Sequence, residues 1–261
     1  MIELYNDSFE NILPTLEDNS IDCVICDPPY NSTTIDWDKD LDWDFIWNQL
    51  KRICKKNANI ILFSQGLFMA KLITSNPNNF KYDLVWNKNK CGSPGLAKYR
   101  PQKVHENILV FNYGKGIYNP IMEKGEPYHR ECKDKEKGYG TGKNNHGYGF
   151  GVYTESNNTG TRYPKSILHC SRNFSAQQQI HPTQKPVPLL KWLVKTYSNE
   201  NDVILDFTMG SGTTGVACKC LNRSFIGIEK EKQYFDIAES RINNSDIEEK
   251  EEKYLTTQYE F

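Results

Sequence analysis

The feature that most constrains this chain is an apolar run that ends in two consecutive prolines. Residues 21–26 (Ile-Asp-Cys-Val-Ile-Cys) have the composition of a buried β-strand, and Pro28 and Pro29 follow almost at once. Because proline lacks an amide hydrogen and fixes φ, neither a strand nor a helix continues through this pair. Proline also holds the residue before it in an extended conformation. The sequence therefore predicts a rigid corner at the carboxyl end of a strand, which presents Asp27 and Tyr30.

This corner has the chemical groups needed to bind a planar amine. The Asp27 carboxylate and the free carbonyl of Pro28 can accept N–H hydrogen bonds, and the ring of Tyr30 offers a face for stacking. Cys23 and Cys26 have the spacing of metal ligands, but no second pair accompanies them. Packing inside the strand is the favoured interpretation for these thiols, and no metal is expected.

Strand-like and helix-like segments alternate along most of the chain. Strand patterns cover residues 2–5, 21–26, 58–63, 82–86, 108–111, 203–207 and 224–228, and helical patterns cover 8–16, 41–54, 67–73 and 187–197. This alternation is typical of an α/β fold in which helices cover both faces of a mostly parallel sheet. A chain of 261 residues is long enough for one such domain with an insertion.

The alternation stops between residues 113 and 180, where glycine, asparagine, tyrosine and lysine dominate. An irregular segment of this length inside a domain is either functional or disordered. Its basic residues are interleaved with tyrosines, which suits contact with phosphates and bases. Charge is uneven too, because residues 1–50 carry a net charge of −11 and residues 51–111 carry +9. The basic middle predicts a polyanionic partner, although a solvated lysine-rich surface would have the same charge.

A glycine-rich turn predicts a second chemical site nearer the carboxyl end. Gly210, Gly212 and Gly215 match the spacing G-x-G-x-x-G, with a strand pattern before them and a helical pattern after. Such a turn lets a ligand approach the backbone and the amino end of the helix. Glu229 ends the next strand, where acidic side chains hold ribose hydroxyls in doubly wound folds. The combination predicts a nucleotide-like ligand, with a purely structural turn as the alternative.

Nicotinamide cofactors and S-adenosylmethionine both use a turn of this kind with a ribose-binding acid. The amine-binding corner favours S-adenosylmethionine, since nothing in the sequence suggests a partner for hydride transfer. With these residues in place, the sequence resembles the amino-group DNA methyltransferases of the permuted class, whose catalytic segment precedes the cofactor segment. The matching pieces occur in family order at residues 27–30, 86–88, 105–111, 181–186, 206–214 and 227–229.

The resemblance implies a Rossmann-like methyltransferase fold with a mostly parallel, seven-stranded sheet and an inserted DNA-recognition region. It divides the chain into a catalytic half, a target-recognition insertion, a half that binds S-adenosylmethionine, and an acidic tail: residues 1–112, 113–180, 181–245 and 246–261. No apolar run approaches the length of a membrane span and no secretory signal is recognisable, so a cytoplasmic protein without membrane contact is expected.

The resemblance also implies roles for single residues. Catalysis is expected at Asp27, Pro28, Pro29 and Tyr30. Contact with the cofactor is expected from the glycine turn and three further segments, at Asp206, Phe207, Thr208, Gly210, Ser211, Gly212, Thr213, Glu229, Asp7, His181, Thr183 and Lys185. Phe207 and Thr208 depart from the commoner family pattern Asp-Pro-Phe-x-Gly-Ser-Gly, a change that leaves the glycines intact and affects side-chain contacts at those two positions.

The expected reaction is transfer of a methyl group from S-adenosylmethionine to the exocyclic amine of adenine in duplex DNA, after the base flips out. Adenine is favoured because Asp27 opens the corner, where relatives that act on cytosine more often have serine. Methylation of cytosine N4, an RNA substrate and a non-catalytic module that binds cofactor and nucleic acid are the alternatives. Relatives include homodimers and partners of restriction endonucleases, and the sequence leaves both open. The reaction requires Asp27 and Gly210 to converge in one cleft.

Overall fold

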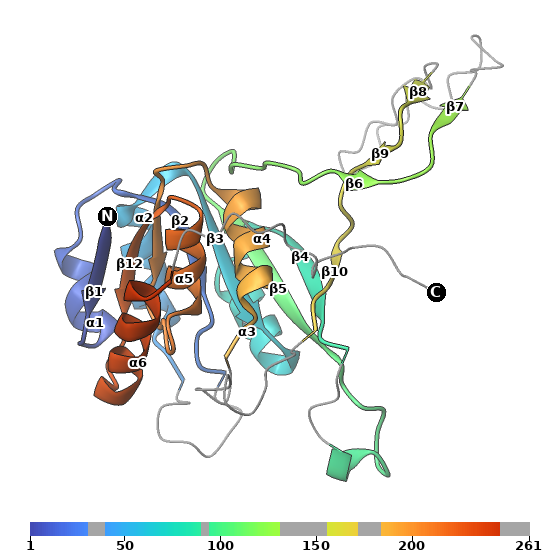
Figure 1. Ribbon diagram of the computed structural model, residues 1–261. Coiled ribbons are helices and arrows are strands. Elements are labelled where there is room, and N and C mark those ends of the chain that lie inside the picture. The colour runs from blue at the N-terminus through green and yellow to red at the C-terminus, as the bar shows by residue number, and fades with distance from the viewer. Residues whose placement is uncertain (31–39, 90–93, 131–155, 172–183, 246–261) are drawn as a thin grey trace. The chain divides into compact units, whose positions relative to one another are not determined.

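In the part of the chain that the structure describes, eight strands form one mixed sheet at the centre of the larger of two compact units (Figure 1). This computed structural model describes residues 1–30, 40–89, 94–130, 156–171 and 184–245. The strand order is β1-β12-β11-β2-β3-β5-β4-β10, and β5 runs antiparallel to both of its neighbours. The strands are β1 (Ile2–Tyr5), β2 (Ile21–Cys26), β3 (Cys54–Ser64), β4 (Phe80–Asn87), β5 (His105–Asn112), β10 (Ile167–His169), β11 (Val203–Asp206) and β12 (Ser224–Ile228).

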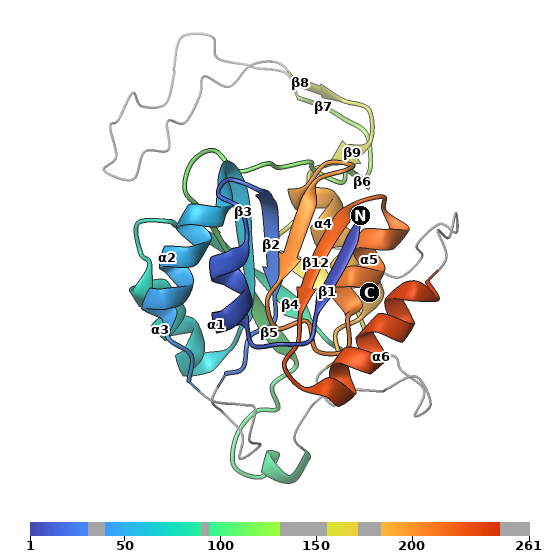
Figure 2. The same cartoon turned by 90° about the vertical axis from the view of Figure 1, so that its left-hand side faces the viewer.

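Helices cover both faces of this sheet, as the alternation of segments predicts (Figure 2). One face carries α1 (Phe9–Ile12), α2 (Trp43–Ile53) and α3 (Gly66–Ser75), and the other carries α4 (Val187–Tyr197), α5 (Thr213–Cys220) and α6 (Lys232–Asn243). Short 3₁₀ turns, η1 (Leu13–Thr15) and η2 (Pro94–Leu96), follow α1 and β4. The predicted α/β class is therefore confirmed. Within the described residues, no helix has the length and apolar character needed to span a bilayer.

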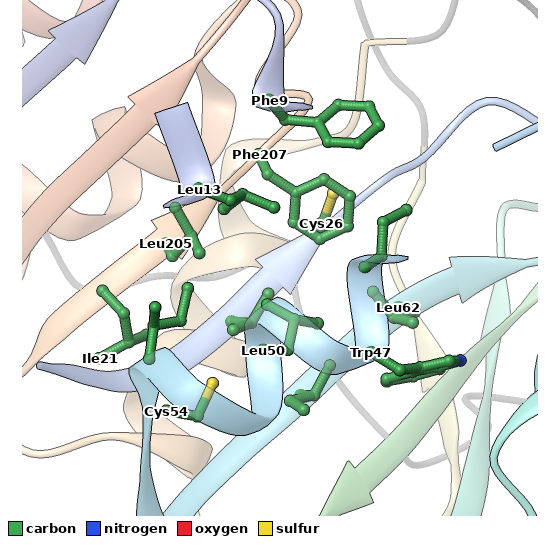
Figure 3. Packing of buried hydrophobic residues seen from close by; sticks show 14 of the residues in the cluster. Phe9, Leu13, Ile21, Cys26, Trp47, Leu50, Cys54, Leu62, Leu205 and Phe207 are labelled. Atoms are coloured by element: carbon green, nitrogen blue, oxygen red, sulfur yellow. The ribbon is translucent and has the colours of Figure 1, made fainter. Parts of the chain in front are cut away.

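The hydrophobic core between the sheet and helices α1, α2 and α3 includes residues at the ends of β2 and β11 (Figure 3). Trp43 and Trp47 lie one helical turn apart on α2, and both are buried against this core, as their spacing predicts. Leu205 and Phe207, from β11 and the residue after it, belong to the same cluster as Cys26 at the end of β2. Each buried side chain of this size contributes roughly 1.5–3 kcal/mol. This packing fixes the ends of β2 and β11 relative to each other.

The sheet has one strand more than the seven that the resemblance implies. In the described residues the additional strand is β10, which pairs in parallel with β4 at the edge of the sheet. It has only three residues, Ile167–His169, and lies within the irregular segment 113–180. Three residues are too few to show the alternation that marks a strand in a sequence, so this element is visible only through its pairing.

Residues 120–164 form the smaller compact unit. Its described part contains two antiparallel pairs, β6 (Glu123–Lys124) with β9 (Thr161–Arg162) and β7 (Tyr128–Arg130) with β8 (Ser156–Asn158). The guanidinium of Arg162 lies over the ring of Tyr128, 4.8 Å from its centre. This unit falls within the range predicted as an insertion. Residues 131–155 and 172–180 of that range, and the predicted tail 246–261, lie outside the described residues, and the domain ranges themselves remain predictions.

Candidate active site

The two corners predicted from the sequence lie at the same edge of the sheet. β2 pairs in parallel with β11, with Cys23 opposite Ile204, so both strands end on the same side. β3 and β12 continue the sheet in opposite directions from this pair, which makes it the point where the strand order reverses. Ligands bind at such a point in open α/β sheets. Thr208 joins the two corners directly, because its hydroxyl donates a 3.3 Å hydrogen bond to the backbone carbonyl of Asp27.

A cavity of about 510 Å³ opens at this edge, within the range of small-molecule sites. Among the residues predicted from the sequence, those that line it are Asp7, Asp27, Pro29, Lys185, Asp206, Phe207, Thr208, Gly210, Ser211, Thr213 and Glu229. Pro28, Tyr30 and Gly212 are not part of its described lining. His181 and Thr183 lie outside the described residues. One cavity thus brings together most of the predicted catalytic and cofactor segments, and Asp7 and Glu229 among them are 222 positions apart in the sequence.

Asp27 is held by contacts to both of its oxygens. The Tyr30 hydroxyl donates to Oδ1 at 2.7 Å, and the Lys185 ammonium donates to Oδ2. Burial raises the pKa of Asp27, while the charge of Lys185 opposes that rise. The ring of Tyr30 stacks on Phe68 with centroids 5.0 Å apart. One face of the tyrosine is therefore already covered, and a base that stacks on this ring would use its other face.

Asp206 is the last residue of β11, and its buried carboxyl group accepts hydrogen bonds from two neighbouring residues. Its Oδ2 accepts from the Thr214 hydroxyl at 2.7 Å, and its Oδ1 accepts from the Thr208 amide at 3.2 Å. Burial raises the pKa of Asp206 to about 7, and the neighbouring charge of Asp27 acts in the same direction. Since a cation stabilises the charged form of a nearby carboxylate, these two acids suit a positively charged ligand.

Glu229 and the glycine turn are bonded to each other. The Glu229 carboxylate accepts from the backbone amides of Gly210 at 3.0 Å and Glu231 at 2.8 Å. Gly210 has φ +51° and faces open space on the cavity side, whereas Gly212 has φ +74° and lies against Ala238 of α6. The first glycine therefore leaves room for a ligand, and the second leaves room for a helix.

Asp7 begins the cavity wall at the end of β1. Its Oδ1 accepts from the Ser8 amide at 2.7 Å and from the Asn11 side chain at 2.8 Å, and these bonds lower the pKa of Asp7. Ser8 caps α1 without a hydrogen bond from its side chain, so Asp7 provides the side-chain contact at this helix start. Next to it, Phe9 packs edge-to-face on Phe207 with centroids 5.7 Å apart and adds an apolar wall to the cavity.

Several lining residues were not predicted from the sequence. Gln184 adjoins Lys185 in the segment before α4 and is recognisable from that motif, whereas Phe9, Phe63 and Leu190 look like ordinary core positions. Glu106 lies close to Lys185, with 3.6 Å between Oε2 and Nζ. It falls inside a piece that carries the family resemblance, residues 105–111, yet the sequence alone assigns it no role.

Comparison with known proteins identifies the family. A family model described as a DNA methylase, of the N6 and N4 type, matches residues 21–240. The chain belongs to this family of DNA methylases. The type II methyltransferase M.HpaI of Haemophilus parainfluenzae is 29% identical over 251 residues, which cover 89% of this chain and 71% of that protein. M1.MboII of Moraxella bovis is 27% identical over 257 residues, with coverage of 91% and 95%.

Solved structures agree with the fold of this methylase. The complex of M1.HpyAVI with S-adenosylmethionine superposes with a TM-score of 0.63 at 24% identity, covering 93% of this chain and all of that one. The PvuII DNA methyltransferase, named as cytosine-N4-specific, has a TM-score of 0.64 at 14% identity, with coverage of 92% and 86%. The expectation of an amino-group DNA methyltransferase is confirmed. The M1.HpyAVI complex contains S-adenosylmethionine, the cofactor that the sequence predicts for this chain.

The residues of the cavity fit that cofactor. S-adenosylmethionine carries a sulfonium cation, a ribose and a planar adenine. The carboxylate of Asp206 suits the cation, Glu229 suits the ribose hydroxyls, and Phe9 with Phe207 offers an apolar wall for the ring. These individual roles remain predictions.

Proposed function

We propose that this DNA methyltransferase transfers the methyl group to the N6 amine of adenine in duplex DNA, after the base flips out of the helix. The observation that carries the proposal is the position of Asp27. Its carboxylate stands at the end of β2, on the wall of a cavity that Asp206, Gly210 and Glu229 also line. A hydrogen-bond acceptor for an amine thus lies beside the segments expected to hold the methyl donor.

S-adenosylmethionine, when bound, supplies an electrophilic methyl group on its sulfonium. Asp27 and the carbonyl of Pro28 would accept the two hydrogens of the exocyclic amine, which turns the nitrogen lone pair toward that methyl group. Because the nitrogen becomes cationic as the bond forms, a fixed carboxylate stabilises the transition state more than the ground state. The face of Tyr30 opposite Phe68 would stack on the flipped base, a contact worth ~1–3 kcal/mol.

Adenine is favoured over cytosine by the acid that opens the corner. The sequence places aspartate at position 27, where the resemblance associates serine more often with cytosine. The fold does not discriminate between the two bases, since the PvuII enzyme, which is named as cytosine-N4-specific, has a similar architecture. Methylation of cytosine N4 by the same displacement is therefore the second candidate.

Digestion of treated DNA to nucleosides tests the proposal. Unmethylated plasmid incubated with the protein and S-adenosylmethionine should yield N6-methyldeoxyadenosine by mass spectrometry. The control is Asp27→Ala, which should bind the cofactor normally but have a turnover lower by roughly 10²-fold or more, because one contact to the developing cation is lost. N4-methyldeoxycytidine as the product would replace the first candidate with the second. Normal turnover of the alanine variant would remove Asp27 from the mechanism.

The names of the relatives suggest a biological setting. M.HpaI and M1.MboII are both called type II methyltransferases. We infer that this protein likewise modifies specific DNA sites and works alongside a restriction endonuclease. Plasmid recovered from cells that express the protein should resist cleavage by one restriction enzyme, and sequencing of the modified bases would give the site. The sequence leaves open whether the protein is a homodimer, and the molar mass in solution would answer this question.

A further inference from the structure

Four side chains of alternating charge form a buried line beside the cavity. The ammonium of Lys185 pairs with Oδ2 of Asp27 and lies 3.6 Å from Oε2 of Glu106. The other oxygen of Glu106, Oε1, lies 2.9 Å from the ammonium of Lys88. The side chains of Lys185, Glu106 and Lys88 are 9–12% exposed and that of Asp27 is 24% exposed. The line therefore has its most accessible end at Asp27, the residue proposed to accept the target amine.

Each member of this line comes from a different element. Asp27 follows β2, Glu106 lies near the start of β5, Lys88 follows β4, and Lys185 lies just before α4. The ammonium of Lys185 also lies 5.0 Å from the ring centre of Phe63 on β3. An isolated buried charge is strongly destabilising, whereas here every charge has a neighbour of opposite sign. Because Lys185 lies between two acids, it keeps a partner of opposite charge even when one of those contacts is lost.

The contact between Lys185 and Asp27 affects both the charge and the orientation of the Asp27 carboxylate. Burial favours the neutral carboxylic acid, and Glu106 adds a like charge that favours it further. Lys185 opposes both effects and favours the ionised carboxylate, which is a stronger hydrogen-bond acceptor than the neutral acid. Tyr30 and Lys185 contact different oxygens, so together they fix the plane of the carboxylate. An ammonium at Oδ2 also occupies the kind of contact that an amine N–H would make.

We propose that Lys185 is a positioning residue for Asp27: it orients the Asp27 carboxylate before the target amine binds. When the amine replaces the Lys185 ammonium at Oδ2 of Asp27, Glu106 retains Lys185 in the site. This inference rests on the proposed function, because it requires Asp27 to bind the amine that is methylated. It differs from the role expected from the sequence, in which Lys185 contacts the cofactor. Since Lys185 lines the cavity, the two roles predict different effects of the same substitution.

Substitution of Lys185 separates the two roles. Lys185→Met keeps the length of the side chain but removes its charge, and we expect kcat to fall about 10- to 100-fold while the Kd for S-adenosylmethionine, measured by calorimetry, stays within about threefold. Lys185→Arg should restore most of kcat, because it returns a cation to the line. Lys195→Met is the matched control, because Lys195 is an exposed residue in the last turn of α4 and is not part of the cavity lining, so no change is expected.

Glu106→Gln tests whether Glu106 holds Lys185 in place. The amide is a weaker partner for the ammonium than the carboxylate, so kcat should fall about threefold to tenfold with the cofactor Kd unchanged. Thermal unfolding of every variant checks folding. If Lys185→Met does not fold, Lys185→Arg and Glu106→Gln decide the question, since both keep a partner at each position.

Two results would overturn the inference. One is a Kd for the cofactor at least tenfold weaker in Lys185→Met with kcat at saturation retained, which would make Lys185 a cofactor-binding residue. The other is an unchanged kcat in both Lys185→Met and Glu106→Gln. The product of the unsubstituted protein is identified first, by nucleoside digestion. A cytosine product at that stage overturns the adenine proposal, and the effect of Lys185 on kcat is then measured on the base that is methylated.

Discussion

Asp206 is the residue whose protonation is expected to control cofactor affinity near neutral pH. Its pKa is raised to about 7 by burial, so a large share of the protein holds it as the neutral acid at pH 6 and few molecules do at pH 8. A cationic ligand beside this carboxyl favours the ionised form, and binding therefore releases a proton. Affinity for S-adenosylmethionine should therefore rise with pH through about 7. If only the ionised form binds, the change between pH 6 and pH 8 is about tenfold.

Calorimetric titration at pH 6, 7 and 8 measures this dependence. The amine of the cofactor can also titrate in this range, so Asp206→Asn is the necessary control. The asparagine variant should bind more weakly at pH 8 and should lose the part of the pH dependence that Asp206 causes. Identical pH profiles for the two proteins would contradict the assignment of Asp206 to the cofactor site.

The glycine turn is one element with two separate functions. Gly210 has positive φ and open space around its missing side chain, so alanine there would add a strained backbone, at roughly 1 kcal/mol, and a methyl group in the cavity. At Gly212 a Cβ would come 2.8 Å from the Cβ of Ala238, which adds an overpacking cost of about 1–3 kcal/mol to the same strain. Alanine at Gly210 should therefore weaken ligand binding, whereas alanine at Gly212 should lower the stability of the fold.

Paired alanine variants test this division. Gly210→Ala should lower Tm by only about 2–4 °C yet weaken binding of S-adenosylmethionine by at least about tenfold. Gly212→Ala should lower Tm by roughly 5–15 °C, with cofactor affinity close to normal in the molecules that remain folded. Equal effects of the two variants on both Tm and affinity would show that the turn acts as a single unit.

The helices and strands were more predictable than the contacts between their ends. Local patterns predict β2 and α4 with the observed bounds, because an apolar run and a helical period depend only on neighbouring residues. The ion pair of Asp27 with Lys185 joins residues 158 positions apart, and the packing of Gly212 on Ala238 joins two different elements. No local pattern encodes such pairs. For this reason the sequence indicated which segments form the site but not which side chains in it touch one another.

At the scale of the whole molecule, the cavity lies in the larger unit, and the smaller unit lies in the segment that is predicted to contact DNA. Every strand of the described main sheet and all of the lining residues of the cavity belong to the larger unit, residues 1–119 and 165–261. The smaller unit, residues 120–164, lies within the segment whose basic and aromatic composition predicts contact with DNA. The larger unit has its own sheet and core, so removal of the smaller unit should not unfold it.

Replacement of residues 120–164 by a flexible Gly/Ser linker is therefore expected to weaken DNA binding and to leave cofactor binding intact. The shortened protein should unfold cooperatively and bind S-adenosylmethionine within about threefold of the normal Kd, because the cavity is intact. Its affinity for duplex DNA should fall at least tenfold and its binding should depend less steeply on salt, since phosphate contacts are lost. A matched insertion of the same linker after Asn119, with the unit retained, controls for the break in the chain. Unchanged DNA affinity in the shortened protein would place the DNA contacts on the larger unit, where residues 51–111 carry the net charge of +9.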